Sequence, residues 1–266
     1  MSRPTIHFAP ANSFPARSYD KLFSFLAHDF EIGYLNLHAH NPLFPVRDGW
    51  QKLADELKTE IEKRYTKPVI GVGHSLGGIL HFLVAVRNPE LYSALVLLDA
   101  PLASRLSGAG LRFAKRTRLI RKIPPFKVAV RRRREWDSKQ AAFEHFAGKF
   151  RSFDPEMVRD YVQHGTIENE DGSVKLLFKP EIEAKIYRTI PHNFSQFRGK
   201  LTVPAAYIGG TDSREARLAR LGFMRRNFPF RFRFIKGSHH FPFQKPEQTA
   251  EAISRIIADL NPNQSV

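Results

Sequence analysis

A serine lies in a glycine-framed turn in the first third of the chain. Residues 73–77 read Gly-His-Ser-Leu-Gly, and they join a predicted buried strand at 69–72 to a predicted apolar helix at 76–87. Strand, sharp turn and helix form the context in which Gly-x-Ser-x-Gly indicates a nucleophile elbow. Glycines on either side of the serine let strand and helix approach without colliding side chains. We therefore expect Ser75 to be a nucleophile and the Leu76 N–H, at the start of the helix, to donate to a developing oxyanion.

A serine hydroxyl becomes a good nucleophile only when a base removes its proton, and an acid must orient that base. On this kind of elbow the three residues follow the chain order Ser, acid, His. Asp212 comes just after a predicted strand at 203–208, and His239 and His240 come after a predicted strand at 231–235. Asp99, directly after a predicted strand at 94–98, is an alternative acid. We prefer Asp212, because a carboxylate in the position of Asp99 is also frequent as a structural residue.

Together these motifs resemble the α/β-hydrolase superfamily, in its branch of small capped serine hydrolases and esterases. The resemblance covers residues 4–102 and 200–260. In this family the catalytic histidine usually precedes a Pro-Glu helix start by seven positions. His239 lies seven positions before Pro246 and His240 lies six, so the resemblance favours His239 as the base. It thereby implies a Ser75–His239–Asp212 triad.

The loop after the first strand departs from the family pattern. The family carries a His-Gly pair before an aromatic residue, whereas Asn12 and Ser13 precede Phe14 here. The resemblance implies the Phe14 N–H as the second oxyanion donor, although the missing glycine restricts this backbone. We expect no cofactor and no metal, since His38 and His40 lack a third ligand at suitable spacing. The residues expected to contact substrate are Asn12, Ser13, His40, His74, Trp136 and His240.

Alternating strands and helices predict how these residues are positioned. The alternation favours an α/β fold, a mostly parallel sheet of about six strands flanked by helices. Between residues 103 and 198 the alternation stops, and the chain becomes basic, aromatic and mostly helical. We therefore predict an α/β-hydrolase core at 1–102 and 199–266, with a helical cap at 103–198 inserted after the strand that ends near Asp99.

Composition narrows the class of protein. The 266 residues include no cysteine, which excludes thiol nucleophiles and disulfides, and they carry a net charge of +16. The charge is local, because residues 103–134 hold twelve Lys or Arg and no acid. No zinc spacing, RNA-binding aromatic signature or helix-turn-helix accompanies it, so we do not expect nucleic acid as a partner. An anionic membrane surface would also suit this charge, without further support in the sequence. Lacking a signal-like or membrane-length apolar segment, the chain is expected in the cytoplasm.

A serine at the elbow distinguishes this chain from relatives that carry aspartate there and open epoxides or displace halide. The resemblance implies acyl transfer to water through a covalent acyl-enzyme. The phenylalanine-rich insertion favours an apolar acyl or aromatic substrate. We thus predict a carboxylesterase-like serine hydrolase with a small-molecule substrate. Hydrolysis of a thioester, lactone, amide or carbon–carbon bond by the same triad remains open, as does a non-catalytic ligand receptor, and the oligomeric state is not predicted.

Overall fold

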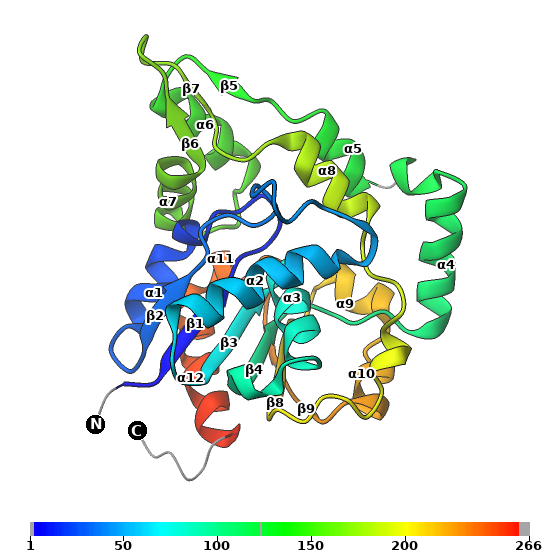
Figure 1. Cartoon of the computed structure of the whole chain (residues 1–266). Helices are drawn as coiled ribbons and strands as arrows, with labels where there is room; N and C mark the ends of the chain where they lie inside the picture. Colours follow the sequence, from blue (N-terminus) through cyan, green and yellow to red (C-terminus); the bar gives the residue numbers. More distant parts are fainter. Residues whose placement is uncertain (1–2, 123, 261–266) are drawn as a thin grey trace.

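A six-stranded, fully parallel sheet forms the centre of the molecule (Figure 1), and the computed structural model describes residues 3–122 and 124–260. The strand order is β2-β1-β3-β4-β8-β9, which confirms the predicted α/β-hydrolase fold with about six strands. The strands are β1 (Thr5–Ala9), β2 (Glu31–Tyr34), β3 (Val69–His74), β4 (Tyr92–Leu98), β8 (Ala205–Gly210) and β9 (Phe230–Ile235).

Both faces of this sheet are buried, as a parallel sheet requires. Along β4, Ala94, Val96 and Leu98 face one hydrophobic cluster, while Leu95 and Leu97 face the other. Helices α1 (Asp20–Leu26) and α12 (Pro246–Leu260) contribute to the first cluster, and α2 (Gln51–Arg64) and α3 (Leu76–Ala85) to the second. After β8 the chain forms two short helices, α9 (Arg214–Ala219) and α10 (Gly222–Asn227), which are separated where Arg220 has a positive φ of 56°.

Strand order determines which loops meet. Strand β4 lies between β3 and β8, and all three run parallel, so their carboxyl ends share one edge of the sheet. The turn after β3, the residue after β4 and the loops after β8 and β9 are therefore neighbours. Side chains separated by more than 160 residues in the sequence can meet at this edge.

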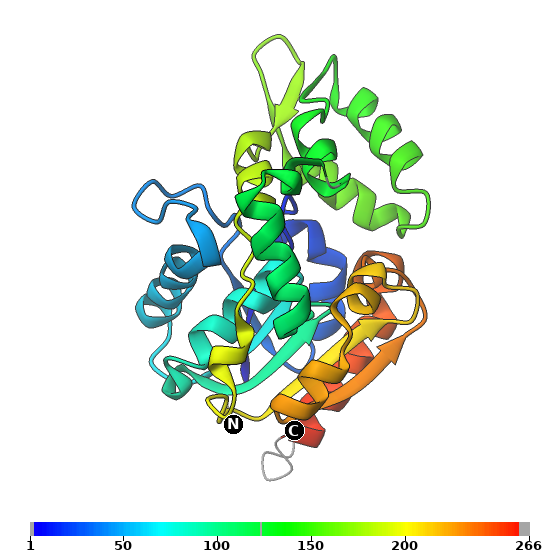
Figure 2. The same ribbon diagram turned by 90° about the vertical axis from the view of Figure 1, so that its right-hand side faces the viewer.

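Between β4 and β8 the described part of the chain forms a mainly helical layer over this edge, which we call the insertion, with α4 lying alongside the core (Figures 1 and 2). A small antiparallel sheet of order β5-β7-β6 also occurs here, and the helical reading of the sequence missed it. Its strands are too short to show alternation in the sequence. The main elements are α4 (Arg105–Arg116), α5 (Pro124–Val130), β5 (Glu135–Trp136), α6 (Lys139–Lys149), α7 (Pro155–Gly165), β6 (Thr166–Glu168), β7 (Val174–Leu176) and α8 (Pro180–Arg188).

Aromatic side chains join this layer to the core. The ring of Phe14, after β1, lies 5.1 Å from that of Tyr161 and 4.7 Å from that of Phe243 in α11 (Phe241–Gln244). Phe153 stacks on Phe243 with ring centroids 4.9 Å apart. The insertion is thus held closely over the loops at the carboxyl edge. Within the described ranges, no helix combines the length and apolar character that crossing a bilayer requires.

Candidate active site

Ser75 occupies a strained turn between β3 and α3. Its φ of 52° and ψ of −112° are rarely adopted by residues other than glycine, and its N–H donates to the Leu98 carbonyl oxygen at 2.9 Å. A Cβ at Gly73 would lie 2.4 Å from the carbonyl carbon of Gly77. A Cβ at Gly77 would lie 2.0 Å from the Ala9 carbonyl oxygen. Both glycines are therefore needed for the close approach of strand and helix that supports the turn.

His239 reaches Ser75 from the loop that follows β9. Its Nε2 lies 3.0 Å from the Ser75 Oγ, and its Nδ1 lies 2.6 Å from the Asp99 Oδ2. A neutral imidazole satisfies both contacts when Nδ1–H donates to the carboxylate and Nε2 accepts from the hydroxyl. The structure thus brings Ser75, His239 and Asp99 into one hydrogen-bonded chain.

The carboxylate that contacts His239 belongs to Asp99, so the prediction that Asp212 orients this ring is wrong. Asp212 is exposed, and its N–H donates to the Gly237 carbonyl oxygen at 2.8 Å. Strand β8 ends at Gly210, so the chain turns there and directs Ser213 inward instead. The sequence did carry a signal for Asp99, because it directly follows the buried strand next to β3 and the serine turn.

The Asp99 carboxylate is wholly buried and well supplied with donors. The Tyr207 hydroxyl donates to Oδ1 at 3.0 Å and the Gly210 N–H donates to the same oxygen at 3.2 Å. The Ser213 hydroxyl donates to Oδ2 at 2.5 Å. Such bonds offset the cost of burying a charge and hold the carboxylate against the imidazole. Burial and the charge of Asp99 raise the pKa of Tyr207, which therefore stays a protonated donor.

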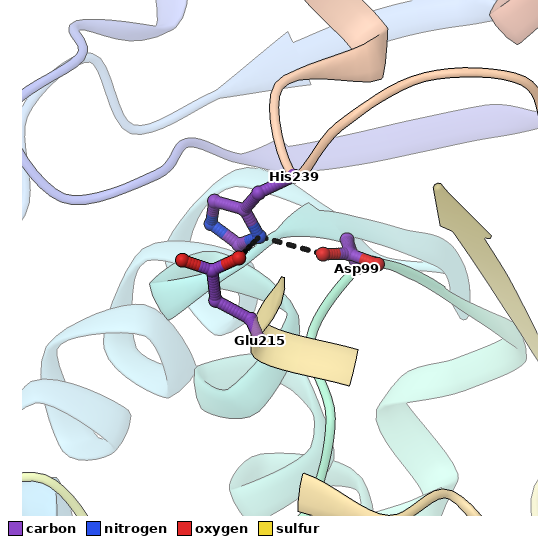
Figure 3. A group of neighbouring side chains, drawn as sticks. All are labelled: Asp99, Glu215 and His239. Carbon is purple, nitrogen blue, oxygen red and sulfur yellow. Dashed lines mark hydrogen bonds and ion pairs between the residues drawn. The ribbon is translucent and has the colours of Figure 1, made fainter. Parts of the chain in front are cut away.

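The environment of His239 favours its protonated form. Burial by itself would lower the pKa of His239, but the hydrogen bond to Asp99 and the negative charge of Asp99 outweigh it and raise the pKa. Glu215 on α9 adds to this effect, with Oε2 3.9 Å from the same Nδ1. Figure 3 shows both carboxylates directed at one side of the ring. An imidazole in this field accepts a proton more readily than a free one.

The same three side chains have an arrangement that a metal ion could use. The ligand atoms of Asp99, Glu215 and His239 lie within 4.8 Å of one another. However, Nδ1 of His239 carries the proton that it donates to Asp99, so it has no free lone pair for a metal. A metal here would require loss of that proton and of the hydrogen bond that orients the ring. This donor set therefore fits the orientation of the imidazole better than metal binding.

The two predicted oxyanion donors differ in whether their N–H groups already have an acceptor. Leu76 is the first residue of α3, where N–H groups have no acceptor inside the helix. The Phe14 N–H instead donates to the Ala11 carbonyl oxygen at 3.1 Å, which corrects the prediction for Phe14. Ser13 has a φ of 68°, so it adopts the left-handed conformation that the glycine of the family would favour.

A small hollow of about 10 Å³, with space for about one water molecule, adjoins this loop. Leu76 lines it together with Asn12, Ser13 and His40, whose contact with substrate stays a prediction. Its apolar wall comes from Leu37, Phe178, Ile182 and Ile186. The hollow is therefore small, has a lining of both polar and apolar residues, and is bordered by α8.

Three other predicted substrate contacts have different positions. His74 is fully buried, with Nδ1 2.7 Å from the Tyr19 hydroxyl and Nε2 2.9 Å from the His239 carbonyl oxygen, so it supports the His239 loop. His240 packs against Phe14 rather than facing Ser75, and burial lowers its pKa to about 3. Trp136 is 1% exposed and packs on Phe146 inside the insertion, so the prediction that it contacts substrate is wrong.

A buried ion pair above the hollow was missed by the sequence analysis. The Arg132 guanidinium donates to the Glu183 Oε1 at 2.8 Å, and both side chains are less than one-tenth exposed. The Asn12 side-chain amide donates to the Glu183 carbonyl oxygen at 3.3 Å. Burial raises the pKa of Glu183 although Arg132 opposes this effect. No local pattern predicts such a pair, because its members are 51 residues apart.

Comparison with known proteins shows the family of this chain. The Alpha/beta hydrolase family matches residues 8–252. The chain belongs to this family. A relative in Alternaria alternata, the abhydrolase domain-containing protein AFT2-1, is 25% identical, and the alignment covers 73% of this chain and 82% of that protein. A second protein of that fungus, AKT2, is 24% identical over the same shares.

Solved structures of this alpha/beta hydrolase fold are similar over nearly the whole chain. E-2-(acetamidomethylene)succinate hydrolase superposes with a TM-score of 0.73 at 18% identity, covering 96% of this chain and 92% of that one. An esterase from Mycobacterium tuberculosis superposes with a TM-score of 0.69 at 19% identity, covering 97% and 86%. At such identities the likeness shows the fold alone.

Proposed function

We propose that this protein is a serine hydrolase that cleaves a carboxylic ester with an apolar acyl or aromatic group. The observation that carries the proposal is the hydrogen-bonded chain from Asp99 through His239 to Ser75, at 2.6 and 3.0 Å. A nucleophile, a base and an orienting acid within hydrogen-bond reach are the groups that acyl transfer needs. Asp99 takes the role that the sequence analysis had assigned to Asp212.

In the acylation step, His239 Nε2 removes the proton from the Ser75 hydroxyl as Oγ attacks the ester carbonyl carbon. The carbonyl oxygen gains the negative charge, and the Leu76 N–H donates to it. The C–O bond to the alcohol then breaks, and the alcohol leaves with the proton from His239. The acyl group stays on Ser75 as an ester.

In the deacylation step, a water molecule replaces the alcohol. His239 removes a proton from water as its oxygen attacks the acyl-enzyme, and the proton then returns to Ser75 as its bond to the acyl carbon breaks. Asp99 remains a carboxylate throughout and stabilises the imidazolium that forms in each step. The raised pKa of His239 matches this requirement.

The apolar wall of the hollow supports an apolar acyl group. Phe178, Ile182 and Ile186, which follow β4 and precede β8 in the chain, line it together with Leu76. Apolar walls with few polar groups are typical of sites for small apolar ligands.

A fluorophosphonate probe tests this proposal directly, since it phosphonylates an activated serine. We expect stoichiometric labelling of the wild type, no labelling of Ser75→Ala, and strongly slowed labelling of His239→Ala. His240→Ala is the matched control, because its ring lies beside His239 without contacting Ser75. On p-nitrophenyl butyrate we expect His239→Ala to lose on the order of 10⁴-fold in kcat. Folded wild type that neither labels nor turns over the ester would contradict the proposal and favour a non-catalytic receptor.

A further inference from the structure

The insertion contains an open hollow lined by positive charge, separate from the hollow next to Leu76. Its volume is about 650 Å³, and it lies between α5, the segment that follows it, and α6. Five of its seven lining residues are Lys or Arg. We call it the basic hollow; it is lined by Lys127, Arg131, Arg132, Arg133 and Lys149, with His145 and Val128.

The positive charge in the basic hollow is poorly neutralised. Among the residues that the structure describes, Arg132 is the one lining cation that forms an ion pair, with Glu183. Burial, followed by the charge of Arg132, lowers the pKa of Lys149. Burial and the charges of Lys149, Arg133 and Arg132 lower the pKa of His145. These cations therefore repel one another, and a bound anion would remove that repulsion.

Arg132, one of the residues that line the basic hollow, has a buried donor without an acceptor, while its Nη1 donates to the Tyr161 hydroxyl at 3.5 Å. Its side chain is 8% exposed, and its Nε is buried with no hydrogen-bond partner among the described residues. The guanidinium also lies 5.4 Å from the ring centre of Phe178. A buried donor left unpaired is costly, and an anionic oxygen is the acceptor that a guanidinium binds best.

We propose that the basic hollow binds a small molecule that carries two or more phosphate groups. The four lining cations beyond the Arg132–Glu183 pair match the charge of a di- or triphosphate, and the volume lies within the usual range for small-molecule sites. Arg and Lys are the side chains that recognise phosphate. A bilayer or duplex presents its phosphates on a broad surface and does not reach a buried guanidinium.

The ion pair connects the basic hollow to the proposed active site. Arg132 lines the basic hollow, and its partner Glu183 lines the hollow beside Ser13 and Leu76. An anion bound by Arg132 would compete with Glu183 for the same guanidinium. The binding itself does not depend on the proposed ester hydrolysis.

Calorimetric titration of the full chain with inorganic tripolyphosphate tests this site. We expect binding at about 0.15 M ionic strength, weakening as salt rises. The variant Lys127→Ala/Arg131→Ala removes two exposed cations one helical turn apart and should weaken binding about tenfold or more, equivalent to about 1.4 kcal/mol. Arg112→Ala/Arg116→Ala is the matched control, with the same spacing and charge change outside the basic hollow, and should stay within roughly twofold of wild type.

Parallel titrations with coenzyme A distinguish an organic ligand that bears phosphate groups from free polyphosphate. Tighter binding of coenzyme A than of tripolyphosphate would assign the site to the phosphate-bearing part of an organic ligand, and equal binding would assign it to free polyphosphate. Equal losses in both double variants, or no binding of either probe, would overturn the proposal. So would binding to anionic vesicles or duplex DNA that tripolyphosphate does not displace. Fluorophosphonate labelling of Ser75 in the same samples shows separately whether the proposed hydrolase function holds.

Discussion

Two histidines in this molecule, one half-buried and one fully buried, have opposite acid–base properties. His239, at the carboxyl edge of the sheet, has its pKa raised, whereas burial lowers the pKa of His81, on α3, to about 3. Both rings are removed from most of the solvent. His239 contacts the Asp99 carboxylate at 2.6 Å, while His81 contacts the neutral Tyr92 hydroxyl at 3.0 Å. The adjacent charge, rather than burial, decides which imidazole can act as a base.

His81 is packed against other aromatic rings in the core. His7 on β1 packs edge-on to His81 with ring centroids 5.4 Å apart, and both nitrogens of His7 are without partners among the described residues. A Cβ at Gly71 would lie 2.9 Å from the His81 Nδ1, so this glycine makes room for the ring. Burial, then the charges of His81 and other cations, lowers the pKa of His7. These rings act as neutral packing groups.

Removing the negative charge of Asp99 should lower the pKa of His239, so that this imidazole becomes a weak base like that of His81. Asp99→Asn preserves the shape but not the charge, so the imidazolium of each step is no longer stabilised and the tautomer is no longer specified. We expect kcat for p-nitrophenyl butyrate to fall on the order of 10⁴-fold, as for the comparable change in other triads. Steady-state kinetics on variants with wild-type circular dichroism measure this effect.

Asp212→Asn is the control for that experiment, since the side chain is exposed and lies away from the imidazole in the structure. Its kcat should stay within roughly twofold of wild type. A large loss in Asp212→Asn with an active Asp99→Asn would restore the acid first predicted from the sequence. It would also show that the contact of His239 with Asp99 at 2.6 Å is not the reason why His239 is more basic than His81.

The sequence predicted this active site best where the signal is local. The Ser75 turn needs only five residues and their flanks, and the spacing to Pro246 separated His239 from His240. The acid was predicted wrongly because the choice depends on where β8 ends. With the strand ending at Gly210, Ser213 rather than Asp212 turns toward the site.

Other features depend on tertiary contacts that no short pattern encodes. The Phe14 N–H donates to the Ala11 carbonyl oxygen within a turn. This turn occurs in the loop that lacks the glycine of the family. The Arg132–Glu183 pair joins two elements of the insertion across its interior. The alternation of strands and helices was sufficient for the parallel core, but not for the short strands of the insertion.

The low pKa of His81 predicts that the folded protein loses stability in acid. The pKa of His81 is about 3 when folded and near 6.5 when unfolded, so the unfolded chain binds the proton first as pH falls. Stability is therefore retained above about pH 6.5 and decreases below it, by about 2 kcal/mol for this residue between pH 7 and pH 5. His81→Gln should lose less free energy of unfolding over this range, as measured by urea denaturation at both pH values.

His28→Gln is the control for the stability measurement, because the His28 side chain is 91% exposed. It should keep the pH dependence of the wild type. If His81→Gln also keeps the full wild-type dependence, His81 does not remain neutral in the folded protein, and the contrast with His239 would disappear.

The smallest expected effect concerns the second carboxylate near His239. Glu215 Oε2 lies 3.9 Å from Nδ1 but is 45% exposed, so solvent screens its charge. Glu215→Gln should lower the pKa of His239 slightly and move the acid limb of kcat/KM to lower pH, since a neutral base then persists further into acid. We expect kcat at pH 8 to change less than about threefold, because an exposed pair contributes little. A loss as large as that of Asp99→Asn would instead make Glu215 a second orienting acid, and two carboxylates would then be needed to keep this imidazole basic.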